Sequence, residues 1–493
     1  MNQKKSGIFL SYATLFSSSI LSILITPFML RQLGDIEYGL YQSISSFVGV
    51  LAILDFGTGI TTTKYIASYR LKNDKKGEEN YLAIQFIINL AVSAIITVAG
   101  MFVVRSVDSI FSGQFGPEDI QKARILALLY IVNIVITIFA NWAHGMLSGC
   151  QKFATANGLN LIKILIRYGL IYILLKCNLG SIAISIADIF AGLLFLLIAF
   201  GYAGSKLNIR IKLTKWDRTL FLSTFTFSAA LLIQTIVNQL NNSIDKVLLG
   251  SILGGTAVTV YSIGMSIYLI YGSLSGAVRN VFLPEAVSLI EKNATGSEIT
   301  DFVIRGGRFQ CSVLSFILFG FLLVGKEFIS MWVGNEYQTA WYISLTLMIP
   351  MMFQLSISVT ESVLDAMGKR LIRSVILLIG AGINFLVTII FINNFGVIGA
   401  PVATGLSCVV INMILVIYYH KIMGLQIGRM CRQIFLKAIL CGTAASVLPL
   451  LVDQINVPVF LSFLLKGVIF TCLYGLLLWR FVWDKNIKKA WNI

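Results

Sequence analysis

Leu33-Gly34-Asp35-Ile36-Glu37-Tyr38-Gly39-Leu40-Tyr41 is a short polar break between two long apolar runs of the sequence. Part of it recurs in the second half of the chain, where Leu253-Gly254 is followed by Tyr261 at the same spacing, again between apolar runs. A second echo relates Asn178, Gly180, Ile182 and Ala187 to Asn394, Gly396, Ile398 and Ala403, all four at one offset that nearly equals the first. Self-similarity at a nearly fixed period predicts two copies of one membrane unit of roughly 210 residues, followed by a tail.

The composition is that of an integral membrane protein. Hydrophobic residues make up 57% of the chain and charged residues 12%, with a mean hydropathy of +0.85, whereas soluble domains carry about 25% charged residues. A helix needs about 20 apolar residues to cross the hydrocarbon core, and such runs lie at 8–30, 40–62, 81–104, 125–147, 157–175, 181–203, 220–249, 257–280, 309–325, 340–364, 374–392, 397–419, 433–451 and 457–480.

These runs predict an all-α polytopic membrane protein of about 14 transmembrane helices. Residues 1–215 and 216–425 form two pseudo-symmetric six-helix lobes in this prediction, and residues 426–493 add two further spans and a cytoplasmic tail. The first run follows Lys4 and Lys5 but is too long for a signal-peptide core and lacks a cleavage site, so we expect it to be retained as the first span.

The net charge of +16 is distributed as membrane topology requires, not as a nucleic-acid surface would be. Most of the 38 basic residues fall in every second connection between the predicted spans, or at the chain ends on the same side. Examples are the clusters Lys72, Lys75 and Lys76; Lys206, Arg210, Lys212 and Lys215; and Lys485, Lys488 and Lys489. By the positive-inside rule both termini lie in the cytoplasm. We expect no nucleic-acid partner.

Catalytic and metal-binding constellations are missing from the sequence. The seven cysteines are scattered singly and the two histidines, His144 and His420, lie far apart, so no metal site is predicted. The longest connections, 105–124 and 284–308, carry only isolated acidic residues. A membrane glycosyltransferase or polymerase would need an acidic metal-binding pair or a large polar loop, so we predict a transporter without catalytic residues.

The first and seventh spans carry matching polar stripes. In the first span Thr14, Ser18, Ser22 and Thr26 recur every four residues, and the repeat aligns them with Gln234, Asn238, Asn242 and Lys246, beside which stand Asn241 and Asp245. Amides and charges cannot face lipid without a large cost, so both stripes should face the bundle interior or a watery cavity. The alternative, stronger for the first span, is that its hydroxyls bond back to carbonyls of their own helix.

Several charges lie inside or at the ends of predicted spans, where ionisable groups are costly and commonly functional. The cations are Lys246, Arg167, Arg31, Arg279 and Lys64, although Arg31, Lys64 and Arg279 sit at span ends where snorkelling to the interface is the alternative. The candidate ion-coupling carboxylates are Asp55, Asp188 and Asp245.

Three groups of segments resemble bacterial polysaccharide flippases. The first is Thr26-Pro27-Phe28-Met29-Leu30-Arg31-Gln32-Leu33-Gly34, continued by Tyr38-Gly39-Leu40-Tyr41 and Leu54-Asp55-Phe56-Gly57; the others are Asn242-Ser243-Ile244-Asp245-Lys246 and Ala366-Met367-Gly368-Lys369. These proteins are the Wzx-like oligosaccharide transporters of the multidrug/oligosaccharidyl-lipid/polysaccharide exporter (MOP) superfamily. The resemblance covers essentially the whole chain and implies a V-shaped transporter with spans one, two, seven and eight around a central cavity.

The resemblance implies alternating-access transfer of an undecaprenyl-diphosphate-linked oligosaccharide to the outer leaflet of the bacterial cytoplasmic membrane, for capsule, exopolysaccharide or O-antigen-type polymers. Sugars would bind Thr14, Ser18, Ser22, Gln234, Asn238, Asn241 and Asn242, and the diphosphate one of Lys246, Arg167, Arg31, Arg279 or Lys64. No cofactor is expected beyond coupling to protons, sodium or the membrane potential. The expected partners are lipid-linked oligosaccharide, membrane lipid, a polysaccharide polymerase and other assembly proteins. The alternatives are a peptidoglycan lipid-precursor flippase, a cation-coupled multidrug antiporter and a scaffold protein of cell-wall assembly.

Overall fold

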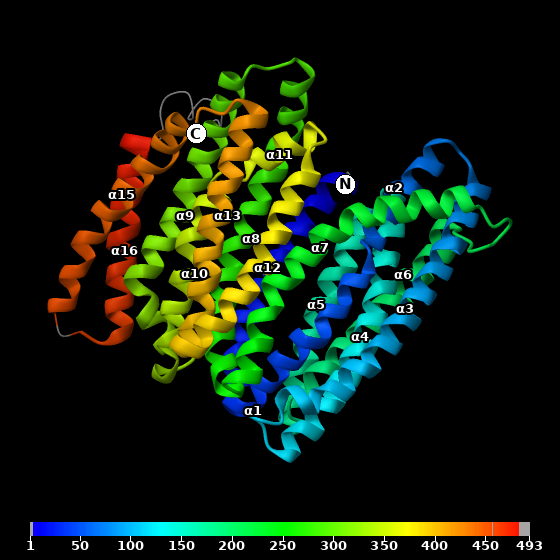
Figure 1. The fold of residues 1–493 in the computed structure, drawn as a ribbon, viewed down its shortest axis with the longest axis horizontal. Helices are drawn as coiled ribbons and strands as arrows, with labels where there is room; N and C mark the ends of the chain where they lie inside the picture. The colour runs from blue at the N-terminus through cyan, green and yellow to red at the C-terminus, as the bar shows by residue number, and fades with distance from the viewer. Residues whose placement is uncertain (1–2, 456, 483–493) are drawn as a thin grey trace. The chain divides into compact units, whose positions relative to one another are not determined.

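The computed structural model describes residues 3–455 and 457–482, which contain helices and no strand (Figure 1). The first helices are α1 (Gln3–Gly49), the 3-10 helix η1 (Val50–Asp55), α2 (Thr58–Leu71), α3 (Lys75–Phe111), α4 (Pro117–Gly149), α5 (Phe153–Lys176), α6 (Ile182–Leu207) and α7 (Arg218–Ile252). The next are α8 (Gly255–Glu291), α9 (Gly296–Trp332), η2 (Asn335–Tyr337), α10 (Thr339–Ser356), α11 (Val359–Ala366), α12 (Arg370–Phe395), η3 (Gly396–Ile398) and α13 (Gly399–Met423). The tail contains α14 (Ile427–Cys431), the π-helical turn η4 (Arg432–Leu436), α15 (Lys437–Val447), η5 (Leu448–Gln454), α16 (Val459–Leu477) and the π-helical turn η6 (Leu478–Val482).

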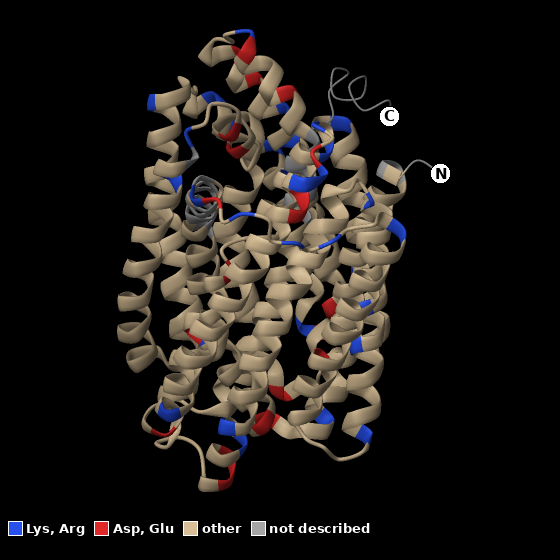
Figure 2. Ribbon diagram, turned by 90° about the vertical axis from the view of Figure 1, so that its right-hand side faces the viewer, with Lys and Arg blue, Asp and Glu red and all other residues tan. Residues whose placement is uncertain are grey.

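The all-α expectation is confirmed, and each predicted span overlaps one to three consecutive helical elements. Of the helical segments among the described residues, nine are long and apolar enough to cross a membrane, or ten if the bent pair α10 and α11 is one span. Two of the nine, Ser6–Leu71 and Leu371–Met423, each contain two of the predicted spans. Charged residues gather mainly toward the helix ends, with a few at mid-helix (Figure 2).

The polar break at residues 33–41 separates two helical segments, which the label α1 covers together. They meet in a kink at Gly34, the one residue of α1 with non-helical backbone angles, at φ 71° and ψ 174°. Such a positive φ is easily reached only by glycine, because a Cβ atom would clash with the backbone. One glycine therefore redirects the chain, and the residues that follow it resume helical geometry at once.

A second break interrupts the second predicted span. Phe56 and Gly57 both adopt left-handed angles between η1 and α2. Asp55, the last residue of η1, accepts hydrogen bonds from the hydroxyl of Thr58 at 2.6 Å and from the amide of Asn141 on α4 at 2.9 Å. This carboxylate thus joins the start of α2 to the neighbouring helix.

The chain forms two compact units, Met1–Thr259 (unit 1) and Val260–Ile493 (unit 2). In unit 1, α1 packs against α5 and α7, while α4 contacts α2, α3 and α6. In unit 2, α10 contacts α9 and α13, α12 packs on α13, and the hairpin of α15 and α16 lies against α9 (Figure 1). The predicted lobe boundary at residue 215 belongs to the sequence repeat and stays a prediction.

The repeat is visible in the helices themselves. Helices α3 (Lys75–Phe111) and α9 (Gly296–Trp332) both have 37 residues, and their starts are separated by nearly the same interval as the repeated motifs. Each begins after a side-chain cap: Asp74 accepts from the amide of Gly77, and Thr295 accepts from the amide of Glu298. Because N-caps satisfy backbone amides that would otherwise have no partner, both copies fix the start of this helix by the same device.

Candidate functional site

Close backbone packing positions the candidate site in unit 1. A Cβ atom on Gly39 would overlap the carbonyl group of Gly255, and one on Gly250 would overlap the hydroxyl of Ser43. The second half of α1 therefore lies directly against α7 and the start of α8. Glycine permits this approach because it adds no side chain between the helices.

This packing brings Lys246 of α7 onto α1. The Lys246 ammonium donates to the amide oxygen of Gln42 at 3.0 Å, and the Gln42 amide nitrogen donates to the hydroxyl of Tyr38 at 3.0 Å. Within the described part of the chain, Lys246 forms no ion pair. A half-buried cation held by a neutral amide retains the capacity to bind an anion.

Arg167 of α5 pairs with Asp188 of α6 beside the same segment of α1. The guanidinium donates from Nε and Nη2 to the two carboxylate oxygens and lies over the ring of Tyr168 at 5.0 Å. Tyr41, next to Gln42 in the chain, and Tyr130 of α4 lie within electrostatic range of both charged groups. The residues Tyr38, Tyr41, Gln42, Arg167, Asp188 and Lys246 are called the α1 polar cluster below.

The α1 polar cluster is drawn from four helices and combines two cations with one carboxylate. Arg167 is already neutralised by Asp188, whereas Lys246 is bound only to a neutral group among the described residues. Of the predicted cations, Lys246 is therefore the better placed to bind an anionic group. Sequence reasoning did not identify Tyr38 or Gln42, although their four-residue spacing directly after the Gly34 break places both on one helix face.

The predicted stripe of the first span follows the alternative interpretation in part. The hydroxyl of Thr14 donates to the carbonyl of Leu10 at 2.7 Å, and that of Thr26 donates to the carbonyl of Ser22 at 2.7 Å. Thr14 also lies 3.4 Å from the carbonyl of Asn157 on α5. Ser18 and Ser22 are half-buried on the same helix.

The polar stripe on α7 is more exposed than the stripe of the first span. Asn238, Asn241 and Asn242 are exposed, whereas Asp245 is 2% exposed. Arg31 and Lys64 are exposed at their helix positions, away from the α1 polar cluster's hydrogen bonds. The side chains of Gln234 and Arg279 lie outside the described residues.

Unit 2 contains a neutral counterpart of the Arg167–Asp188 pair. Asn384 of α12 donates to the hydroxyl of Thr404 on α13 at 3.2 Å. The sequence repeat aligns these two residues with Arg167 and Asp188, to within one position. The two copies therefore make a contact at the same place with different chemistry.

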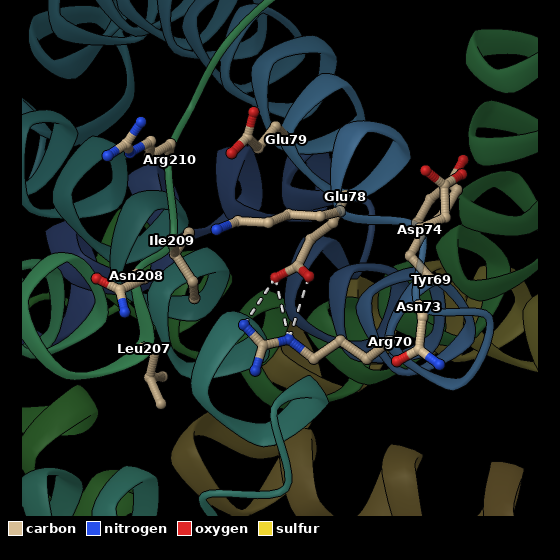
Figure 3. Close-up of a pocket in the computed structure, with 11 residues that line it drawn as sticks. Tyr69, Arg70, Asn73, Asp74, Glu78, Glu79, Leu207, Asn208, Ile209 and Arg210 are labelled. Atoms are coloured by element: carbon tan, nitrogen blue, oxygen red, sulfur yellow. Dashed lines mark hydrogen bonds and ion pairs between the residues drawn. The ribbon is translucent and has the colours of Figure 1, made fainter.

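Among the described residues of unit 1, two cavities carry charged side chains. A cavity of about 250 Å³ is lined by Glu37, which accepts hydrogen bonds from the backbone and hydroxyl of Ser181 and from Lys122. The other, of about 370 Å³, contains the bidentate Arg70–Glu78 pair, and Arg210 points away from that pair at its edge (Figure 3). No group of three or more metal-ligating side chains occurs in the part of the chain that the structure describes.

Comparison with known proteins places this geometry in context. The family model described as "Polysaccharide biosynthesis protein" matches residues 4–289. A protein of Haloferax volcanii described as the probable low-salt glycan biosynthesis flippase Agl15 is 23% identical over 420 residues, which are 85% of this chain and 84% of that protein. A protein of Shigella flexneri described as a putative O-antigen transporter is 22% identical over 423 residues, covering 83% and 96% of the two chains.

Solved structures show the same fold. The lipid II flippase MurJ in an inward closed conformation matches with a TM-score of 0.73 and 16% identity, covering 95% of this chain and 98% of that one. An inward-facing multidrug resistance MATE family transporter of the MOP superfamily matches with a TM-score of 0.65 and 15% identity, covering 83% and 94%. The relatives are named as flippases and transporters, which agrees with the expectation that this chain is not an enzyme.

Proposed function

Because this chain belongs to the polysaccharide biosynthesis protein family, we propose that it is a flippase that moves an undecaprenyl-diphosphate-linked oligosaccharide across the bacterial cytoplasmic membrane. The names of the two relatives, a glycan biosynthesis flippase and an O-antigen transporter, support a lipid-linked glycan as cargo. The product would be a repeat unit for capsule, exopolysaccharide or O-antigen-type polymers, delivered to a polymerase at the outer leaflet.

The observation that carries the proposal is Lys246. A cation inside membrane helices is costly, about 2.5–3.5 kcal/mol near the middle of a span, and Lys246 is bound to the neutral amide of Gln42. A diphosphate supplies the missing negative charge and accepts charge-assisted hydrogen bonds from an ammonium group. Gln42 holds the ammonium in place, and Tyr38 in turn holds Gln42.

The sugars require neutral donors and acceptors. The exposed amides of Asn238, Asn241 and Asn242 lie one to two turns before Lys246 on α7. An oligosaccharide attached to a diphosphate at Lys246 would extend along this row, with further hydroxyl partners from Ser18 and Ser22. The polyprenyl tail stays in lipid, so only the polar head needs a protein path.

Movement of the head proceeds by alternating access in this proposal, driven by protons, sodium or the membrane potential. Asp188, Asp55 and Asp245 are the candidate coupling carboxylates. Asp188 is attractive because it holds Arg167, the second cation of the α1 polar cluster.

The test is transport in proteoliposomes with a fluorescent undecaprenyl-diphosphate oligosaccharide, scored by access of an added enzyme to the outer leaflet. Lys246→Met should lower the flipping rate at least tenfold, because one charge-assisted contact to diphosphate contributes about 1.5–3 kcal/mol. Lys246→Arg should retain most of the rate, since the charge is kept. Lys176→Met, which removes an exposed cation at the end of α5 in the same unit, is the matched control and should leave the rate within twofold.

Wild-type flipping by Lys246→Met, at equal protein level, would refute the assignment of this residue. The same vesicles loaded with lipid II or a cationic drug distinguish the alternatives. Faster transport of lipid II would indicate a peptidoglycan-precursor flippase, and drug efflux would indicate an antiporter.

A further inference from the structure

The connection between α6 and α7 has the character of a membrane-binding segment. Residues 208–217, called the linker below, are non-helical and carry exposed apolar side chains at Ile211, Leu213 and Trp216, which are 45%, 48% and 49% exposed. Basic residues alternate with them: Arg210, Lys212 and Lys215 are all exposed. Between 206 and 218 the sequence has five basic residues and one acidic residue.

The linker is held against the helices of unit 1 at two points. The Asn80 side-chain oxygen on α3 accepts hydrogen bonds from the amide and hydroxyl of Thr214, at 2.9 and 3.1 Å, and from the amide of Lys215 at 3.1 Å. Near the start of the linker, Ile209 packs on the core cluster that contains Trp142. These anchors fix the backbone while leaving the apolar and basic side chains exposed.

The position of the linker matches the membrane interface. Its hydrogen bond to Asn80 places it beside the N-terminal end of α3. The positive-inside rule assigns that end of α3 to the cytoplasm. Tryptophan with lysine and arginine is the combination enriched at that depth, because the ring sits among headgroups while the cations reach phosphate groups. Anionic lipids of the cytoplasmic leaflet attract such basic segments.

We propose that the linker is an anionic-lipid binding surface, in which Ile211, Leu213 and Trp216 insert at the headgroup level and Lys212 and Lys215 bind the phosphates of anionic phospholipid. This surface holds the connection between α6 and α7 on the membrane plane during transport. The proposal goes beyond the flippase function and holds whatever cargo the protein carries.

Quenching of Trp216 tests the proposal in the full-length protein. The chain is reconstituted with brominated phosphatidylcholine or brominated phosphatidylglycerol, and subtraction of the Trp216→Phe variant isolates the emission of Trp216 from that of the other tryptophans. We expect quenching by both lipids, with stronger quenching by phosphatidylglycerol. Lys212→Gln/Lys215→Gln should remove this excess, because each lysine near an anionic surface contributes about fivefold in affinity, roughly 25-fold for both.

Arg105→Gln/Lys176→Gln is the charge-matched control, since these residues lie toward the opposite ends of α3 and α5. It should leave the excess quenching unchanged. Native mass spectrometry of retained phospholipid provides a second measurement that needs no tryptophan change: the wild type should retain phosphatidylglycerol over phosphatidylcholine, and the linker variant should not. Absence of Trp216 quenching by either lipid would overturn the proposal and favour a protein partner, and equal quenching by both lipids would overturn the role of the lysines.

Discussion

The Arg167–Asp188 pair provides a quantitative test of the interior of unit 1. Asp188→Asn leaves the guanidinium of Arg167 without its charged partner, and arginine cannot lose its proton to escape the cost. Removing one partner of a buried ion pair costs about 3–5 kcal/mol. Arg167 keeps 28% of its side chain exposed and Asp188 11%, so protein does not fully enclose the pair, and we expect a loss at the lower end of this range, about 3 kcal/mol.

The companion substitution should be milder. Arg167→Met strands Asp188, but a carboxyl group in an apolar setting can take up a proton and become neutral. The double variant Arg167→Asn/Asp188→Thr copies the neutral Asn384–Thr404 contact of unit 2 and should regain at least half of the stability that Asp188→Asn loses. The three variants therefore rank in a defined order.

Thermal unfolding in nanodiscs measures this order. Unfolding is followed by tryptophan fluorescence, to which Trp142, fully buried in unit 1, contributes. A domain of this size shifts by about 2–4 °C per kcal/mol, so Asp188→Asn should unfold roughly 6–12 °C lower. A shift below about 1 °C would show that the pair is not buried as described. A double variant no more stable than Asp188→Asn would show that charge desolvation is not the cause.

Two further predictions concern packing and the tail. Gly39→Ala should destabilise unit 1 by about 1–3 kcal/mol, because its methyl group would overlap the carbonyl of Gly255. The control is Gly169→Ala, whose methyl group meets no atom within 4 Å. It should be neutral or slightly stabilising in the same thermal assay. Lys466→Met should lower the unfolding temperature, since it leaves the largely buried carboxylate of Glu327 without its cation; an unchanged unfolding temperature would contradict this.

The sequence predicted the helices well because crossing hydrocarbon imposes a length and an apolar composition that can be read without knowing contacts. It also located the break at residues 33–41, but not that Gly34 alone makes it. A window of hydropathy averages over several residues, whereas a single positive φ is a local steric event. The predicted break is therefore present, and one residue makes it where two helical segments meet.

The site was harder to predict. A four-residue period shows which side chains share a helix face, but not which helix that face meets. Lys246 and Gln42 are 204 residues apart in the sequence, and only the packing of α7 on α1 joins them. The hydroxyl of Thr14 shows the converse: its stripe predicts a cavity, yet its hydrogen bond to Leu10 is local.

Comparison of the two copies shows whether the polar contacts between helices need charged side chains. A polar contact joins the fifth and sixth predicted spans of each copy, and unit 2 makes it with Asn384 and Thr404. Likewise Ser275, which the repeat relates to Asp55, hydrogen bonds to Ser358 at 3.2 Å in unit 2; Ser358 lies within one position of the residue that the repeat relates to Asn141, the partner of Asp55 in unit 1. Neutral groups therefore suffice for packing.

Unit 1 uses charges at both places, and each charge carries a desolvation cost that unit 2 avoids. Because the same contact is available without that cost, stability does not account for Arg167, Asp188 or Asp55. Charges that lower stability and are not needed for packing are expected where function requires them. Neutral replacement of both partners, as in Arg167→Asn/Asp188→Thr, should consequently keep the fold and lose transport, whereas replacements of Asn384, Thr404, Ser275 and Ser358 should act mainly through stability.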